Sequence, residues 1–393
     1  MLLQNKTIAI VGGGPGGLTL ARLLQLKGVD VKVYERDADQ YARMVGSPLD
    51  LHETSGLAAL RMAELLDEFK KNYRPGADRE LIVNEQAEIF FDDHHIKPEE
   101  NFGSEHFRPE IDRGPLRNML LESLTPGTVI WNSHFISMER QGDGWMLHFK
   151  NAEPVYADLV IGSDGANSKV RPHLTSIKAF YSGILMIEGN VINAAKATPH
   201  IFEMLRGGKL MAFGDRKNLL MGSKENGDIT YYISFKADEQ WVRENGLDYS
   251  NSAQMLEWFR NTYTAWSPLW HELLNNAATP FIPRPIYCMP LDQSWEAVGN
   301  ATIIGDAAHV MPPFAGEGVN MAMLDALELA ECLTSGKHIS LVNAISSYET
   351  GMCARASQAA KESLENGERM HAPDALETMV GFFNGMHATQ DPA

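Results

Sequence analysis

Hydrophobic positions at the start of the chain follow two different periods. Residues 7–11 form a short run of β-branched and apolar side chains, the pattern of a strand buried on both faces. Residues 18–26 carry leucines at helical spacing, and residues 30–34 return to a strand pattern. The pattern predicts a strand, a glycine-rich loop, a helix and a second strand.

The middle of the chain alternates apolar and polar positions. Residues 128–159 predict an antiparallel hairpin or meander that ends in a buried strand at 159–161. From 179 to 280, strand-like runs separated by hairpin turns predict a separate antiparallel sheet. We also expect a helix that begins at Thr54, two short strands within 79–91 and a helix over 110–124.

The last part of the chain returns to the first domain and then becomes helical. A strand at 301–304 is followed by a helix that runs from Asn320 to about Gly336. Residues 340–368 predict one long helix, and we expect residues beyond about 381 to fray.

Composition narrows the class of protein. With 393 residues, two domains are expected, and a net charge of −17 argues against a nucleic-acid binder. The three cysteines have no disulfide or metal-ligand spacing, and the adjacent His94 and His95 fit a solvated turn better than a metal site. The early first strand and the lack of a membrane-spanning apolar run predict a cytoplasmic protein without stable membrane association.

The first glycine loop carries the earliest chemical evidence. Gly12 permits a tight turn, Gly14 lets a pyrophosphate approach, and Gly17 lets the helix pack on the strand. Glycines also serve ordinary turns, but the strand–loop–helix–strand context favours dinucleotide binding. Glu35 at the end of the second strand favours an unphosphorylated ribose, as in FAD or NAD, although Arg36 could serve a 2′-phosphate.

Two later strand ends resemble this arrangement. In residues 303–320, Asp306 ends a strand, a Pro-Pro-Phe turn follows, and Gly316 and Gly318 precede a helix. In residues 159–171, a strand runs into an Asp-Gly turn and then Arg171. We hypothesise that these loops and the first glycine loop hold one large cofactor.

Arg113 and Arg117 lie on one face of the predicted helix over 110–124. They could share an anionic partner or be ordinary surface arginines, and the sequence leaves both interpretations open.

Three motifs in this order, GGGPGG…YER, DLVIGSDGANSKVR and IGDAAHVMPPFAGEGVN, resemble the class A flavoprotein monooxygenases. These are FAD- and NAD(P)H-dependent aromatic hydroxylases. Further blocks, such as VYERDADQYARMVGSPLDLH and EIDRGPLRNMLLESL, are similar to TetX-type tetracycline-inactivating monooxygenases. The resemblance covers nearly the whole chain.

The resemblance implies an α/β fold with a Rossmann-type FAD-binding domain like that of para-hydroxybenzoate hydroxylase, an antiparallel-sheet substrate domain and a long C-terminal helix. The implied FAD-binding domain comprises 1–73, 106–172 and 281–336. The substrate domain comprises 74–105 and 173–280, and the bridging helix 338–371. We expect a monomer.

The resemblance also assigns residues. The positions implied to contact FAD are Gly12, Gly14, Gly17, Glu35, Arg36, Asp50, Arg113, Asp306, Gly316, Gly318, Val319 and Asn320. Arg43 falls on a position linked to NADPH, and Arg171 with the Asp164-Gly165 turn is implied to help both dinucleotides. The substrate cavity would be lined by Glu188, Lys209, Met211 and Phe314.

Three positions depart from the tetracycline-inactivating relatives. Where those relatives have glutamine, arginine and histidine, this chain has Glu188, Lys209 and Thr230. Lysine keeps the charge of arginine but not its planar fork. Tetracycline and a different polycyclic or phenolic substrate therefore both stay open.

By the resemblance, NAD(P)H reduces the flavin, O₂ adds at C4a, and the flavin C4a-hydroperoxide hydroxylates an aromatic or polycyclic substrate. No catalytic side chain and no metal are expected, and His309 is interpreted as structural. The alternatives are an FAD-dependent reductase or dehydrogenase, a flavin-containing protein that sequesters a ligand, and a plain NAD-binding protein.

Overall fold

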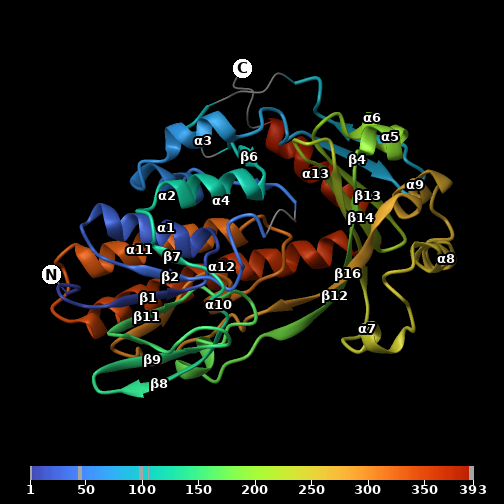
Figure 1. Cartoon of the computed structure of the whole chain (residues 1–393). Helices are drawn as coiled ribbons and strands as arrows, with labels where there is room; N and C mark the ends of the chain where they lie inside the picture. Colours follow the sequence, from blue (N-terminus) through green and yellow to red (C-terminus); the bar gives the residue numbers. More distant parts are fainter. Residues whose placement is uncertain (1, 43–46, 97–100, 105, 389–393) are drawn as a thin grey trace.

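The computed structural model describes residues 2–42, 47–96, 101–104 and 106–388. Two large sheets lie side by side in Figure 1, and helices from the C-terminal part of the chain run between them. We call them the parallel-sheet half and the mixed-sheet half.

The parallel-sheet half contains a five-stranded sheet in the order β17-β11-β1-β2-β7, and all neighbouring strands in it are parallel. Its strands are β1 (Ile8–Val11), β2 (Lys32–Tyr34), β7 (Val129–Ile130), β11 (Leu159–Gly162) and β17 (Ala301–Ile303). Its main helices are α1 (Pro15–Leu26), α4 (Arg113–Glu122) and α11 (Gly318–Thr334). This confirms the predicted α/β fold.

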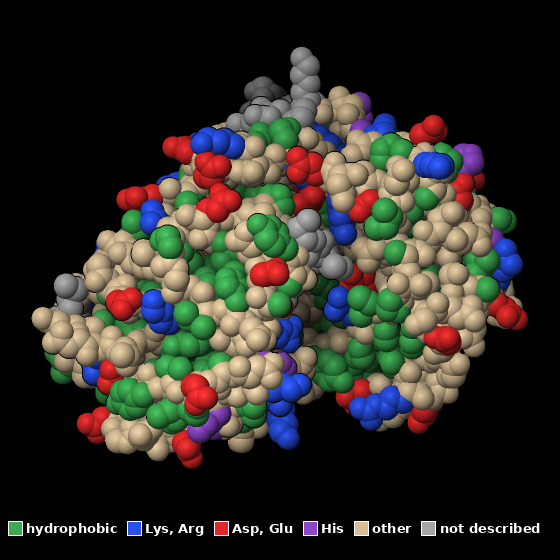
Figure 2. All heavy atoms as spheres, viewed as in Figure 1, with side chains coloured by type: hydrophobic (Ala, Val, Ile, Leu, Met, Phe, Trp, Pro, Cys, Tyr) green, Lys and Arg blue, Asp and Glu red, His purple; other side chains and the backbone are tan. Residues whose placement is uncertain are grey.

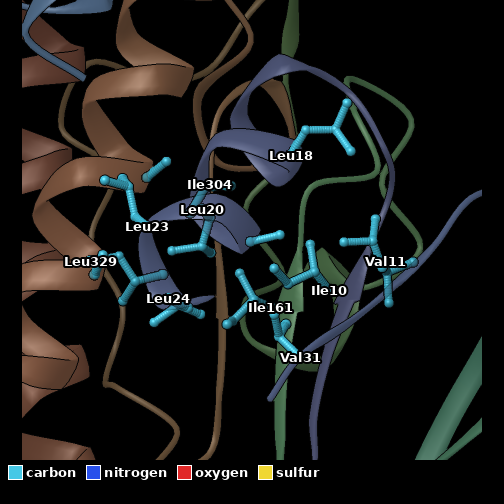
Figure 3. Packing of buried hydrophobic residues seen from close by; sticks show 14 of the residues in the cluster. Ile10, Val11, Leu18, Leu20, Leu23, Leu24, Val31, Ile161, Ile304 and Leu329 are labelled. Atoms are coloured by element: carbon cyan, nitrogen blue, oxygen red, sulfur yellow. The ribbon is translucent and has the colours of Figure 1, made fainter. Parts of the chain in front are cut away.

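Burial on both faces explains why β1 and β11 read as continuous apolar runs. In Figure 3, Leu20 and Leu24 of α1 lie beside Ile10 and Ile161 of the sheet, and Leu23 lies near Leu329 of α11. The leucine spacing of α1 therefore packs it between the sheet and α11.

The mixed-sheet half contains a seven-stranded sheet in the order β16-β12-β15-β14-β13-β4-β5. Its strands are β4 (Glu80–Asn84), β5 (Ile89–Asp92), β12 (Phe180–Val191), β13 (Lys209–Gly214), β14 (Lys217–Ser223), β15 (Ile229–Lys236) and β16 (Ala277–Cys288). The expectation of an antiparallel sheet needs one correction, because β13 pairs with β4 in parallel. Strand β16 also continues past the predicted boundary at 280.

Successive side chains along a strand point to opposite sides, so this sheet has two different faces. One face packs Ile187, Leu219 and Tyr231 against a core that includes side chains of short helices. Those helices are α5 (Ala194–Ala197), α6 (Pro199–Leu205), α8 (Ser252–Thr262) and α9 (His271–Asn275). The register places Glu188 beside Tyr232 and Tyr232 beside Leu220 on the opposite face. We call this second face the inner face.

Two smaller sheets complete the fold. Strands β8 (Phe135–Gln141), β9 (Gly144–Phe149) and β10 (Val155–Ala157) form the predicted meander. Strand β3 (Leu49–Asp50) pairs with β6 (Glu110–Ile111), which occupies the start of the helix predicted over 110–124. This short pair brings Asp50 and Glu110 side by side.

Two helix predictions are wrong in part. The helix expected from Thr54 is divided into α2 (Gly56–Met62) and α3 (Leu66–Asn72), because Glu64 between them has a φ of 61°. Part of the end that was expected to fray, residues 381–388, belongs to α13 (Ala375–Ala388), whose apolar side chains pack on β4, β5 and β13. Residues 389–393 lie outside the described residues.

The predicted long helix is confirmed as α12 (Leu341–Met370). The Ser340 hydroxyl accepts a hydrogen bond from the Asn343 N–H and caps its start. It packs on α11 in the parallel-sheet half, and at its other end the Met370 carbonyl accepts a hydrogen bond from Asn218 of β14. The helix therefore contacts both halves (Figure 1). In the described part of the chain, no helix combines the length and hydrophobicity needed to cross a membrane.

Gly189 on β12 offers a test of the packing between the mixed sheet and its helices. A Cβ there would lie 2.3 Å from the ring of Tyr231, which is fully buried. We predict that Gly189→Ala lowers the free energy of unfolding by about 1–3 kcal/mol through overpacking. Thermal and urea unfolding would measure it.

Gly381→Ala is the matched control, because Gly381 is exposed on α13 and its added Cβ would meet nothing within 4 Å. Alanine favours helix over glycine, so this variant should be stabilised by up to about 1 kcal/mol. Equal effects of the two substitutions would contradict the packing described.

Candidate functional site

The first glycine loop joins β1 to α1 and leaves room for a ligand at one position. A Cβ on Gly12 would lie 2.2 Å from the Ser163 carbonyl oxygen, and one on Gly17 would lie 2.3 Å from the Gly12 carbonyl oxygen. A Cβ on Gly14 would meet nothing within 4 Å. Helix α1 begins directly after Gly14 without a side-chain cap, so its first N–H groups can face an anion.

Glu35 lies where the fingerprint predicts, at the end of β2 beside the glycine loop. Its side chain is buried, and its carboxylate accepts hydrogen bonds from the N–H groups of Gly13 at 2.5 Å and Asp37 at 2.9 Å. The carboxylate is therefore fixed against the loop. Arg36 is exposed.

The predicted convergence of three loops follows from the sheet order. Strands β17, β11 and β1 are parallel neighbours, so Asp306, Asp164 and Gly12 follow the carboxyl ends of adjacent strands. Ligands of open parallel sheets bind at this edge. Gly16 of α1 also approaches Ala322 of α11 so closely that a Cβ would lie 2.9 Å from the Ala322 carbonyl oxygen.

Asp306 begins α10 (Asp306–His309) and has a carboxylate available to a ligand. Its side chain is exposed, and within the described residues no hydrogen bond or ion pair to its carboxylate is recorded. The surrounding protein nevertheless raises its pKa by desolvation, while His309 and Arg113 oppose that shift. A hydroxyl-bearing ligand could supply the missing hydrogen bonds.

Two other groups predicted near the dinucleotide have internal partners. The Asp164 carboxylate accepts hydrogen bonds from Ser168 Oγ at 2.6 Å and the Lys169 N–H at 2.6 Å. The Arg171 guanidinium donates to the Ala308 carbonyl at 2.6 Å and to Gln293 at 2.8 Å. Arg171 therefore braces the segment that carries Asp306, and Asp164 stabilises its own turn.

Among the residues that the structure describes, the two arginines of α4 have different partners. Arg117 forms a 2.9 Å ion pair with Asp37, whereas Arg113 Nε donates to the Ser47 carbonyl at 3.0 Å. Arg113 lies toward Asp306, and Arg117 supports the end of β2. Arg43, predicted to serve NADPH, lies outside the described residues.

Asn320 joins two segments that are far apart in sequence. Its side chain is fully buried, and its Oδ1 accepts the His52 N–H at 2.9 Å. Its Nδ2 donates to the carbonyls of Asp50 and Gly316, both at 3.0 Å. Both side-chain donors are thus used, and Asn320 positions the two loops instead of offering its own amide to a ligand.

A charged bridge reinforces the same contact. His52 Nε2 lies 2.9 Å from Asp50 Oδ2, and its Nδ1 lies 3.3 Å from Glu317 Oε1. Burial alone would lower the pKa of His52, but the hydrogen bonds to Asp50 and Glu317 raise it to about 9. The imidazole is therefore a cation between two carboxylates at neutral pH.

A second charged cluster lies across the interface between the halves. Lys209 of β13 contacts Glu110 of β6 and lies 3.7 Å from Glu80 of β4. Burial raises the pKa of Glu80 to about 8 and that of Glu110 to about 7, against the charge of Lys209. Lys209 is therefore surrounded by carboxyl groups at the edge of the inner face.

Glu188, Lys209 and Met211 lie on the inner face, and Phe314 packs against this face from the turn after α10. The polar side chains among them already have protein partners. Glu188 is buried and forms a 2.5 Å ion pair with Arg284, and Thr230 donates to Asn190 Oδ1 at 2.7 Å. Met211 and Phe314 contact one apolar cluster that also includes Phe213 and Ile82. Figure 2 shows a hollow between the halves, with hydrophobic side chains on the wall of the mixed-sheet half and Lys and Arg side chains at its rim.

His309, which was interpreted as structural, is held inside the protein. It is buried and lies 2.6 Å from Asp325, which also forms a 2.8 Å ion pair with Arg355. Among the described residues, no group of three or more His, Cys, Asp or Glu side chains could hold a metal ion.

Sequence reasoning missed His52, Glu317, Glu110 and Arg284. His52 is only two residues from Asp50, and Glu317 lies inside the predicted glycine loop, so the spacing could have suggested them. Glu110 and Arg284 acquire partners only through strand pairing, which no local pattern reveals.

The sequence pattern that defines the FAD binding domain family matches residues 5–257 and 293–363. A monooxygenase of Emericella nidulans, asqM, is 28% identical over 430 residues, covering 96% of this chain and 95% of that protein. The 3-amino-4-hydroxybenzoate 2-monooxygenase of Streptomyces cremeus is 27% identical, covering 100% of this chain and 94% of that protein.

Solved structures agree on the fold. The tetracycline destructase Tet(55) superposes with a TM-score of 0.76 at 19% identity, covering 98% of this chain and 97% of that chain. This likeness bears on the fold alone.

The bridge at His52 gives a pH prediction. Because the folded pKa of about 9 exceeds the ordinary value of 6.5, the stabilisation is complete below about pH 6.5 and is lost as pH rises through 9. At most about 3 kcal/mol is involved. We predict that His52→Gln is less stable than the wild type at pH 6 and that this difference shrinks by pH 10.

Melting temperatures measured from pH 6 to 10 would test this. The raised pKa values of Glu80 and Glu110 also make both proteins less stable as pH rises, so only the difference between them reports on His52. A difference that stays constant across this range would contradict the charged bridge.

Proposed function

The chain belongs to the FAD binding domain family, and from that premise we propose that it is an FAD-dependent monooxygenase that uses NAD(P)H and O₂ to hydroxylate an aromatic or polycyclic substrate. One oxygen atom enters the substrate and the other leaves as water, with two electrons from NAD(P)H. The curated relatives named above are monooxygenases, which supports the proposed class of reaction.

The observation that supports the proposal most strongly is that the loops after β1, β11 and β17 meet at the carboxyl edge of the parallel sheet. At this edge, an added Cβ on Gly14 or Gly318 would meet nothing within 4 Å, and Asp306 is exposed. These residues follow parallel strands or begin helices, so a long dinucleotide has room there. These residues fit FAD: the glycine loop would hold the pyrophosphate, Glu35 the adenosine ribose, and Asp306 a hydroxyl of the flavin side chain. The loop at 316–320, fixed by Asn320, would border the flavin ring.

FAD, when bound, would supply the redox and oxygen chemistry. The chain's own residues would position the substrate and exclude water. Met211 and Phe314 would provide an apolar wall, and α12 holds the Phe314 turn, since Ser363 Oγ accepts the Phe314 N–H and Asn366 donates to its carbonyl at 3.1 Å.

Tetracyclines are one candidate substrate, by the resemblance of the motifs. The polar positions that would have to receive a tetracycline, Glu188, Lys209 and Thr230, already bond within the protein. A smaller phenolic or aromatic compound would use the apolar wall without breaking these pairs. The nicotinamide cofactor would dock transiently at the surface. By the resemblance Arg43, which lies outside the described residues, would contact it.

Asp306→Ala tests the cofactor assignment. A hydrogen bond to a carboxylate contributes about 1.5–3 kcal/mol, so we predict that FAD dissociates about 10- to 100-fold more readily while the fold is retained. Fluorescence titration of FAD and circular dichroism would measure these two properties. Asp67→Ala, an exposed acid on α3, is the control and should bind FAD normally; unchanged affinity in Asp306→Ala would exclude this carboxylate.

A substrate panel tests the reaction. We predict that tetracyclines or simpler phenols stimulate NAD(P)H oxidation and O₂ consumption, and that the product gains one oxygen atom derived from ¹⁸O₂ in mass spectrometry. NAD(P)H oxidation without O₂ consumption would instead support a reductase. Tight ligand binding without any oxidation would support a sequestering protein.

A further inference from the structure

We propose that Arg284 receives the carboxylate of the substrate, which makes an aromatic acid the substrate class of this site. The inference rests on the proposed monooxygenase function and concerns which compounds the site selects. Nothing in the motif comparison pointed to Arg284. The evidence comes from its partners, its neighbours and the distribution of charge on the inner face.

Arg284 is a cation with donors left over. It lies on the edge strand β16, opposite Met186 in the register, and 48% of its side chain is exposed. Its Nε donates to the Glu188 carboxylate at 2.5 Å. For its two terminal amino groups, no hydrogen bond to a described residue is recorded. An arginine held in this way can offer those two donors to a carboxylate.

Glu188 acts as the anchor of this arginine and not as the group that contacts the substrate. Its side chain is 1% exposed, one carboxylate oxygen accepts from Arg284, and the other lies 3.5 Å from Asn190 Nδ2. A buried carboxylate needs such a partner, since an unpaired buried charge is strongly destabilising. The pair therefore fixes the direction of Arg284.

Other cations near this end of the inner face lack acidic partners. Lys224 donates to Asn190 Oδ1 at 3.3 Å, and Arg113 donates to the Ser47 carbonyl at 3.0 Å. Within the described residues, neither forms an ion pair with a carboxylate. Tyr232 lies among these groups: its hydroxyl bonds Ser47 at 3.0 Å, and it is the register partner of Glu188.

The opposite end of the same face has the opposite balance of charge. There Lys209 is surrounded by Glu80, Glu110 and Asp50, so its charge is already neutralised. Among the side chains that the structure describes, this end therefore offers an anionic substrate no free cation, whereas the terminal amino groups of Arg284 are available to it at the other end. The inner face therefore has its acidic side chains mainly at the β13 end and its available cationic donors at the β16 end.

The apolar neighbours of Arg284 fit an aromatic ring. Ile184, Met186 and Ile286 form a buried cluster on this face, with Leu220, Tyr232 and Phe314 packed against it. A planar ring on this wall would place an attached carboxylate within reach of the guanidinium. An apolar wall with a few directed polar groups is the usual composition of a small-molecule site.

The overall charge of the protein does not favour an anionic ligand. With a net charge of −17, the long-range field does not attract anions. Any preference for a carboxylate over its neutral analogue must therefore come from local cations.

Calorimetric titration of the FAD-loaded protein with matched pairs of ligands tests this. The pairs are 4-hydroxybenzoate with 4-hydroxybenzamide, and 6-hydroxynicotinate with 6-hydroxynicotinamide, at an ionic strength of about 0.15 M to screen distant charges. We expect the wild type to bind at least one acid more tightly than its amide. In Arg284→Gln, the acid should bind about 10- to 100-fold more weakly, and the amide should change little.

Four further variants separate a binding role from a structural one. Glu188→Gln keeps Arg284 and should keep the preference for the acid, and Arg284→Lys should restore part of it. Glu188→Gln combined with Arg284→Gln removes both charges, so it avoids an unpaired buried carboxylate and should still lose the preference. Arg260→Gln, on α8 behind the opposite face of the sheet, should behave as the wild type.

The proposal is overturned if no acid binds more tightly than its amide, or if Arg284→Gln weakens acid and amide equally. Loss of acid preference in Glu188→Gln together with its retention in Arg284→Gln would also overturn it. These results would leave the proposed monooxygenase function intact, because FAD retention and oxygen incorporation are measured separately.

Discussion

The buried amide of Asn320 is the contact on which the geometry of the hollow depends. Its hydrogen bonds join the loop after β3 to the start of α11, across a sequence separation of 268 residues at its bond to His52. All of its donors are used, and a fully satisfied buried polar group holds its neighbours in one arrangement. The Asp50–His52–Glu317 bridge acts on the same two segments. A glycine at 316 is required there, because a Cβ would lie 2.9 Å from an Asp50 carboxylate oxygen.

This constraint explains why so many charged groups can be buried between the halves. A carboxylate removed from water needs a cation or several donors, and each buried acid here has one nearby. Asp50 has His52, Glu188 has Arg284, and Glu110 has Lys209. Glu110 and Lys209 join two different segments, and Glu188 and Arg284 join neighbouring strands of the mixed sheet. Asp50 and His52 lie two residues apart and reach the start of α11 through Glu317. The contacts that compensate desolvation therefore also hold these segments together. Raised pKa values at Glu80 and Glu110 indicate that compensation is incomplete on the Lys209 side.

Local patterns were sufficient to predict the parts of the fold that depend on local rules. The glycine spacing at 12–17 requires close backbone contacts, and the structure shows them at Gly12 and Gly17. The length of α12 followed from an uninterrupted helical pattern. The break at Glu64 and the helix α13 were missed, because the first depends on one left-handed residue and the second on packing against β4, β5 and β13. The parallel pairing of β13 with β4 was missed for a similar reason, since it joins strands far apart in sequence.

In the candidate site, too, some residues could be placed from local sequence and others depend on distant partners. Asp306 and the glycines could be placed from sequence because their roles follow from position at strand ends. Glu188 could be placed on the correct strand and face, but its role depends on Arg284, which lies 96 residues later. By the resemblance to the tetracycline-inactivating enzymes, a neutral amide would be expected at position 188. A glutamate there cannot simply exchange one polar contact for another, because its charge must be compensated once it is buried. The compensating arginine then changes what the sheet presents to a ligand, from an amide to a cation. A single buried substitution can therefore alter the charge preference of a site through its partner, even though the substituted side chain does not itself contact the ligand.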